Sequence, residues 1–320
     1  MAEPNTSGYF WDSLLTLGSI TGSDPYTWPL TASFTKPGSY TLDFSMGNQV
    51  ARFIGFQASE ISPTFTDNEC RWKIKGSALK SFLGAEIASL ASDTVTLKTP
   101  VQHTAPTTGL VAGDLVAVVK ASDGSRQNLV IGSLTSTTVT FTTTPSTISS
   151  GDMLILRPAT PSFSLLDPFL WSRTEFRFAA TASSALSAAH TPLEEGTEFV
   201  VSHPFEDDAG AKSSGSFDPS RHVRSKSIDV TFKAKKYFED PFEVSKLNAL
   251  TSQACVVRMF SGADYEFRLT MNKLTITKGG DKAMIKVDEA LFYEPEYTPS
   301  YNTSDGQGMD VKVLNALSAK

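Results

Sequence analysis

The feature that most constrains the fold of this chain is a run of alternating residues between positions 39 and 76. Residues 40–46 alternate Tyr, Leu, Phe and Met with Thr, Asp and Ser, the period expected of a strand with one apolar and one polar face. Gly47 and Asn48 then mark a turn. The return strand carries Val50, Arg52, Ile54 and Phe56 on one face and Ala51 and Phe53 on the other. Both faces of this strand therefore hold apolar groups, and at least one of them must be covered by another element.

A third strand follows, in which Cys70, Trp72 and Ile74 alternate with Arg and Lys. The order of these elements resembles the N-terminal part of phage tail tube proteins. In that pattern a GSYTL strand, here residues 38–42, leads through a hairpin into a GFQASEIS-like strand, here residues 55–62. A polar-alternating strand follows and ends here at Gly76.

A second block, residues 225–295, extends the resemblance. Residues 228–234 alternate as a strand, and Asp240, Pro241 and Glu243 form the start signal of a helix. Apolar residues at 244, 247, 250 and 254 continue that helix for about three turns. Strands are expected at 255–260, 265–271, 273–277 and 283–293, with a tight turn at residues 278–281. A strand, one helix and antiparallel strands in this order are similar to the core of the tail tube and type VI secretion tube fold.

Between these blocks, residues 83–161 contain an internal echo. TVTLKTP leads to LVAGDLVAVV, and TVTFTTTP leads to ISSGDMLILR. The echo predicts a small barrel or sandwich inserted into a loop of the main domain. Asp114 and Asp152 each follow a glycine, which favours turns with local side-chain hydrogen bonds over metal ligation.

These observations predict a mainly β protein, an antiparallel sandwich or barrel of the tail-tube fold with one packed α-helix and a small inserted all-β domain. The expected parts are residues 1–82, of which 1–38 form an N-terminal arm, the insert 83–161, and 162–320. The arm shows no clear element beyond a short turn near residues 11–17, and its aromatic residues can pack either on the chain's own core or on a neighbouring copy. Residues 190–222 look like a long loop.

Composition narrows the class of protein further. Hydrophobic residues make up 40% of the 320 residues and charged residues 19%, which argues against disorder of the whole chain. The net charge of −6 argues against a protein that grips nucleic acid through its phosphates. No stretch reaches the roughly 20 apolar residues of a membrane-spanning helix, and the first residues lack a signal-peptide pattern. We expect synthesis in the host cytoplasm, with the two cysteines, Cys70 and Cys255, as buried free thiols.

No pattern of catalytic residues is found. The four histidines lie in loop-like segments without metal-site spacing and are expected at the surface, and no nucleophile elbow or phosphate-binding loop is present. We therefore predict neither an enzyme nor a cofactor or metal site. The acidic run Glu206, Asp207 and Asp208 lacks the spacing of a calcium loop and is typical of a solvated loop tip. In the tube that the resemblance implies, it is a candidate for contact between stacked rings or for an acidic lining.

The resemblance implies a structural virion protein that assembles into stacked hexameric rings, the tail tube through which DNA passes without sequence-specific binding. Its implied partners are further copies of itself, a tape-measure protein, and tail-tip and tail-terminator proteins, and its place is the virion tail. The candidate contacts between copies are Val50, Arg52, Ile54 and Phe56, with residues 206–208. Two alternatives stay open: a single-layer tail-tip, terminator or baseplate ring, and a carbohydrate-binding adhesin module suggested by the insert and by Trp28 and Trp72.

Overall fold

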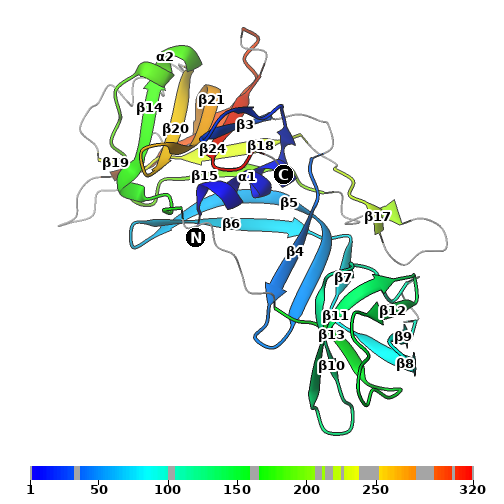
Figure 1. Cartoon of the computed structure of the whole chain (residues 1–320). Helices are drawn as coiled ribbons and strands as arrows, with labels where there is room; N and C mark the ends of the chain where they lie inside the picture. The colour runs from blue at the N-terminus through cyan, green and yellow to red at the C-terminus, as the bar shows by residue number, and fades with distance from the viewer. Residues whose placement is uncertain are drawn as a thin grey trace.

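The structure is a computed structural model of the chain and describes residues 2–31, 37–99, 105–158, 166–205, 211–212, 219–224, 227–237, 252–278, 292–304 and 307–318. Antiparallel strands dominate these residues, which confirms the expected mainly β fold. The strands form two lobes, a large main lobe and a smaller barrel, joined by a long hairpin (Figure 1).

One layer of the main lobe is a sheet in which β14, β20, β21, β24 and β3 pair in that order. Short strands β1 and β2 pair with β3. The bounds are β1 (Thr16–Leu17), β2 (Thr21–Gly22), β3 (Tyr26–Thr31), β14 (Thr174–Ala179), β20 (Gln253–Ser261), β21 (Tyr265–Lys278) and β24 (Met309–Asn315).

The second layer continues from the far end of β21 through β23, β18, β15, β5 and β6. Its bounds are β5 (Val50–Thr66), β6 (Glu69–Ser77), β15 (Glu198–Ser202), β18 (Asp229–Lys233) and β23 (Glu296–Pro299). Two sequence expectations are wrong here. Residues 265–277 form one strand that changes partner along its length, and β15 lies within the segment expected to be a loop. Its short EFVVS run is too brief to stand out from the prolines and glycines around it.

Smaller elements complete the main lobe. They are the 3-10 turn η1 (Trp171–Arg173), α2 (Ala182–Ser187), and two small pairs, β16 (Ala211–Lys212) with β17 (Pro219–Arg221) and β19 (Lys236–Tyr237) with β22 (Phe292–Tyr293). The expected helix from Asp240 and the turn at 278–281 lie outside the described residues, apart from Lys278 at the end of β21. Among the described residues, no helix is long and apolar enough to cross a membrane.

The N-terminal segment is not a loose arm. Residues Pro4–Leu14 form α1, which starts with Glu3 as N-cap and Pro4 in its first turn. Trp11 is fully buried, with its ring 5.1 Å from that of Phe267 in one layer and 5.6 Å from that of Trp72 in the other. The helix thus fills the space between the two layers, and the arm's aromatic residues pack on the chain's own core.

The smaller lobe is a closed barrel. Its strands pair in the cycle β8, β9, β12, β11, β10, β13 and back to β8. The bounds are β8 (Ala85–Ala91), β9 (Thr94–Leu97), β10 (Leu115–Val119), β11 (Arg126–Leu134), β12 (Thr138–Phe141) and β13 (Met153–Leu156). Closure leaves no free sheet edge in this ring of strands, and a hydrophobic cluster distinct from that of the main lobe fills it.

The two halves of the sequence echo pair with each other. The Thr-Val-Thr strands β9 and β12 run antiparallel with Val95 opposite Val139, and β10 and β13 run antiparallel with Ala117 opposite Ile155. Both Gly-Asp turns have the expected local bonds, from Val111 N to Asp114 (2.8 Å) and from Ser149 N to Asp152 (2.9 Å). The barrel is therefore built with approximate twofold symmetry.

The barrel is attached to the main lobe at adjacent points of the chain. It is entered from β7 (Lys80–Phe82) and left at the end of β13. A Cβ atom at Gly84 would lie 3.2 Å from the carbonyl oxygen of Leu154, so entry and exit are neighbours. This is the geometry of an insertion into a loop.

Candidate assembly surface on the hairpin of β4 and β5

The hairpin consists of β4 (Tyr40–Ser45) and residues 50–56 of β5, and it extends from the main lobe along the barrel (Figure 1). Gly47, with φ of +78°, lies in the turn, and Met46 N donates to Gln49 O at 2.8 Å. Among the described strands, β4 pairs with β5 alone. No described strand pairs with the other edge of β4, and an edge of this kind can pair with another chain.

A β-bulge changes which side chains share a face of β5. Tyr40 lies opposite Phe56 and Leu42 opposite Phe53, so one extra residue of β5 is inserted at Gly55, where φ is +69°. Past the bulge the alternation is reversed, and Phe56 lines the same groove as Phe53. The expectation that Phe56 shares a face with Val50 and Arg52 is therefore wrong, because regular alternation does not continue through a bulge.

One face of the hairpin is covered by the chain's own barrel. Val50 is buried in the barrel's hydrophobic cluster, and Arg52 binds Asp114 of the barrel with N to O distances of 2.7 and 3.1 Å. A Cβ atom at Gly109 would lie 2.3 Å from Cδ1 of Ile54, so these residues also approach closely. The expected neighbouring copy is not required to cover Val50, Arg52 and Ile54, because residues of the insert do so.

Arg52 is the most strongly bound charge on this face. Besides Asp114, it forms two hydrogen bonds with Asp43 of β4, both 2.8 Å, and one with Gly109 O, also 2.8 Å. The hydrogen bonds that Arg52 donates to Asp43 raise the pKa of Arg52, burial lowers it, and the bonds to Asp114 add to the rise. The guanidinium therefore stays charged and fully bonded between hairpin and barrel.

The opposite face of the hairpin is open. It borders a groove of ≈ 1260 Å³ between the hairpin, the end of β6 and the turn into β7. Large apolar side chains on its rim are exposed, 55% for Phe44, 52% for Met46 and 55% for Leu83. Phe53 and Leu79 line it as well. We call this feature, lined by Phe44, Met46, Phe53, Leu79 and Leu83, the groove. Exposed apolar groups gathered in this way are typical of surfaces that bind another protein.

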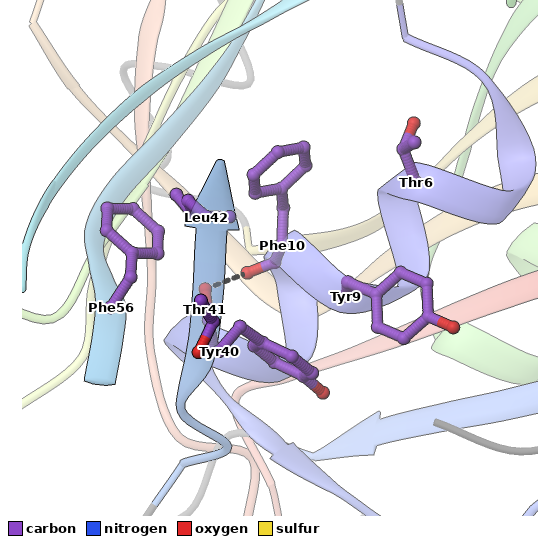
Figure 2. Close-up of a pocket in the computed structure, with 8 residues that line it drawn as sticks. Thr6, Tyr9, Phe10, Tyr40, Thr41, Leu42 and Phe56 are labelled. Atoms are coloured by element: carbon purple, nitrogen blue, oxygen red, sulfur yellow. Dashed lines mark hydrogen bonds between the residues drawn. The ribbon is translucent and has the colours of Figure 1, made fainter. Parts of the chain in front are cut away.

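A smaller hollow of ≈ 290 Å³ adjoins the groove where α1 meets the base of the hairpin. Phe10 and Phe56 lie on either side of Leu42 in it, and the three residues line both hollows (Figure 2). Nearby, the hydroxyl of Tyr40 donates to the buried carboxylate of Asp12. Burial and this carboxylate both raise the pKa of Tyr40, so the phenol remains protonated and ties the base of β4 to α1.

The remaining candidates from the sequence are the acidic run, the cysteines and the histidines. Residues 206–208 lie outside the described residues, and no group of three or more His, Cys, Asp and Glu side chains in the described part could hold a metal ion. Cys70 and Cys255 are buried free thiols, as expected. The expectation that His203 lies at the surface is wrong: the side chain is buried, with Nδ1 3.4 Å from Leu14 O. Burial and the positive charge of Arg224 both lower the pKa of His203.

Of the two tryptophans that suggested a sugar-binding module, Trp28 is internal and Trp72 is partly buried at the wall of the groove, and neither lies in the insert. Trp28 is fully buried, and Trp72 packs against the main core. The insert contains a single aromatic residue, Phe141, which is 2% exposed in the barrel interior. The described barrel therefore presents no aromatic face on which a sugar ring could stack.

Comparison of the sequence with protein-family models and with curated proteins finds no match.

Of the four hairpin residues named from the sequence, Val50, Arg52 and Ile54 lie on the covered face, and Phe56 alone lines the groove. The alternation of residues 40–46 signalled an apolar face on β4, which was expected to be buried. Leu83 carried no signal, because it is an isolated apolar residue next to Gly84.

Proposed function

We propose that this chain is a structural protein that assembles with copies of itself, the major tail tube protein of a long-tailed phage. The observation that carries the proposal is the groove, an exposed apolar surface next to the edge of β4 with which no described strand pairs. Covering that surface and that edge with a second copy removes apolar area from water and satisfies backbone groups.

The contact would be heterologous, because the groove and β4 of one copy would meet a different surface of the next. Such contacts close into a ring when the rotation between copies is a whole fraction of a turn, and further contacts between rings extend the ring into a tube. Six copies per ring, the tape-measure, tail-tip and terminator partners, and passage of DNA follow from the sequence resemblance. A single-layer ring would use the same lateral surface.

The test is self-association of the purified chain at high concentration, followed by sedimentation velocity and negative-stain imaging. We expect rings or tubes. Rings that never stack would favour the tail-tip, terminator or baseplate alternative. Compact monomers under every condition, including with the other tail components added, would rule out both.

A double substitution, Phe44→Ser with Met46→Ser, tests the groove directly. Full burial of such side chains contributes about 1.5–3 kcal/mol each. Because about half of each is already covered, we expect the concentration needed for assembly to rise roughly 10- to 100-fold. The melting temperature should not change. Tyr301→Ser is the control, since Tyr301 is 63% exposed and does not line the groove; equal loss of assembly in both variants would contradict a specific role for the groove.

A further inference from the structure

The hairpin carries the proposed contact surface, and one of its two faces is exposed to solvent. What stabilises it in the free chain therefore has to be explained. A two-stranded hairpin is marginally stable by itself in water and needs packing on another element. On the groove side, Phe44 and Met46 are more than half exposed and give little such packing. At its base the hairpin is tied to α1 by Tyr40 and Asp12. Beyond the base, the support comes from the opposite face, where the barrel lies.

The barrel contacts the hairpin at three levels along its length. At the turn, Arg126 donates to Asn48 O at 2.9 Å. In the middle, Arg52 binds Asp114 and Gly109 O of the barrel. Nearer the base, Ile54 packs against Gly109, where nothing larger than hydrogen fits without a shift.

The backbone joins the two parts as well. Val50 pairs with Leu156 at the end of β13, and it is 6% exposed. Residues 52–54 pair with β7, the strand that leads into the barrel. Hairpin and barrel thus share both a piece of hydrophobic core and a piece of sheet.

The connections alone would not set the barrel's orientation. The chain enters and leaves the barrel side by side near Gly84, and a lobe held at one such place can swing about it. The ion pair of Arg52 with Asp114 has both side chains largely covered, 12% and 10% exposed, and fixes the lobe at a second place. Bidentate Arg–carboxylate pairs impose a definite geometry as well as attraction.

We propose that the inserted barrel is a brace: it holds the hairpin in the one conformation in which the groove faces a partner copy. The barrel is then required for assembly, and its contribution is made within the chain. The contacts between hairpin and barrel support the bracing, while the requirement for the barrel in assembly rests on the proposed function.

The test compares full-length variants by hydrogen exchange and by self-association. Asp114→Asn weakens the link to the barrel and leaves the Asp43–Arg52 pair within the hairpin, whereas Asp43→Asn does the reverse. Arg52→Ala removes both links. Arg71→Ala, at an exposed position on β6, is the control for loss of a positive charge.

We expect amides of residues 40–56 to exchange roughly tenfold faster or more in Asp114→Asn and Arg52→Ala, because local opening becomes easier. Amides of β20 and β21 should be unchanged, which shows that the main lobe remains folded. Assembly should weaken in the same two variants and persist in Arg71→Ala. A stronger effect of Asp43→Asn than of Asp114→Asn would locate the support within the hairpin and overturn the brace.

Unchanged exchange in both barrel-link variants would also overturn it. Faster exchange with normal assembly would refute the requirement for assembly alone. If the unaltered chain never assembles, the proposed function fails, and the exchange comparison still decides whether the barrel braces the hairpin.

Discussion

Gly109 shows at the scale of one residue how closely hairpin and barrel meet. Its φ is +91°, and the place of a Cβ atom is taken by Cδ1 of Ile54 at 2.3 Å. Gly113, four residues later, has φ of +93° and nothing within 4 Å of the same position. At both positions the positive φ would strain any residue other than glycine. The two positions differ because only Gly109 is in close contact with another side chain, that of Ile54.

We therefore expect Gly109→Ala to destabilise the protein more than Gly113→Ala, by about 1 kcal/mol, because the added methyl overpacks the contact. Both substitutions carry a further cost of about 1–3 kcal/mol for the left-handed backbone. Denaturant unfolding measures the difference. Ile54→Val removes the opposing methyl and should cancel the extra cost of Gly109→Ala; an extra cost that persists in the double variant would place the clash elsewhere.

Residue identity alone could not have revealed the groove. Both faces of β5 are apolar in the sequence, and the covering of one face comes from Gly109 and Asp114, more than 50 residues along the chain. The bulge at Gly55 moves Phe56 to the other face, and a glycine in a strand pattern signals a possible bulge without fixing it. The sequence pattern therefore identified the hairpin, and tertiary contacts determined which face is open.

Among the elements, strands with strict alternation were predictable and α1 was not. In β6 and β18 the two faces differ in polarity, so a period of two is visible. The buried face of α1 carries Asn5, Ser7 and Ser13, which hide its periodicity. Their polar groups also bond to distant parts of the chain, since Trp72 Nε1 donates to Ser7 Oγ at 2.7 Å and Ala58 N donates to Ser13 Oγ at 3.2 Å.

Charged side chains link neighbouring strands on the sheet of β14, β20 and β21. Glu266 is 7% exposed and accepts hydrogen bonds from Arg258 (2.8 and 2.9 Å) and Arg268 (2.7 Å). Burial raises the pKa of Glu266, and the bonds from both arginines outweigh it, so the net pKa is below its ordinary value of 4.5. A lowered folded-state pKa means that the pairs stabilise the fold above about pH 4.5, and that this stabilisation is lost as pH falls through the folded pKa.

Glu266→Gln should accordingly reduce the free energy of unfolding at pH 7 by about 2 kcal/mol, since it leaves buried guanidinium groups less well bonded. The difference from the unaltered protein should narrow as the pH falls below about 4.5 and through the lowered folded-state pKa, because the carboxylate then becomes protonated. Glu296→Gln is the matched control, because its partner Lys278 is 74% exposed and such pairs contribute under about 1 kcal/mol. Denaturant unfolding between pH 3 and 7 measures both; a constant deficit across this range would contradict the assignment.

At the scale of the whole molecule, the described residues form two large hydrophobic cores connected through the hairpin, and a small third cluster beside α2. The main core includes Met259, fully buried, and the barrel core includes Ile131, which is 1% exposed. The internal echo made the barrel visible in the sequence as a separate unit. How far the two cores unfold together depends on contacts between lobes, which no local pattern encodes.

All four tryptophans, Trp11, Trp28, Trp72 and Trp171, lie outside the barrel, so tryptophan fluorescence reports on the main lobe while far-UV circular dichroism reports on both lobes. Ile131→Ala should cost the barrel about 2–5 kcal/mol by leaving a cavity. We expect it to produce an earlier phase in the dichroism curve with the fluorescence midpoint unchanged. Met259→Ala should instead lower the fluorescence midpoint. Coincident shifts of both probes in both variants would show a single cooperative unit, whereas separate shifts mean that the barrel can open, and release the hairpin, while the main lobe stays folded.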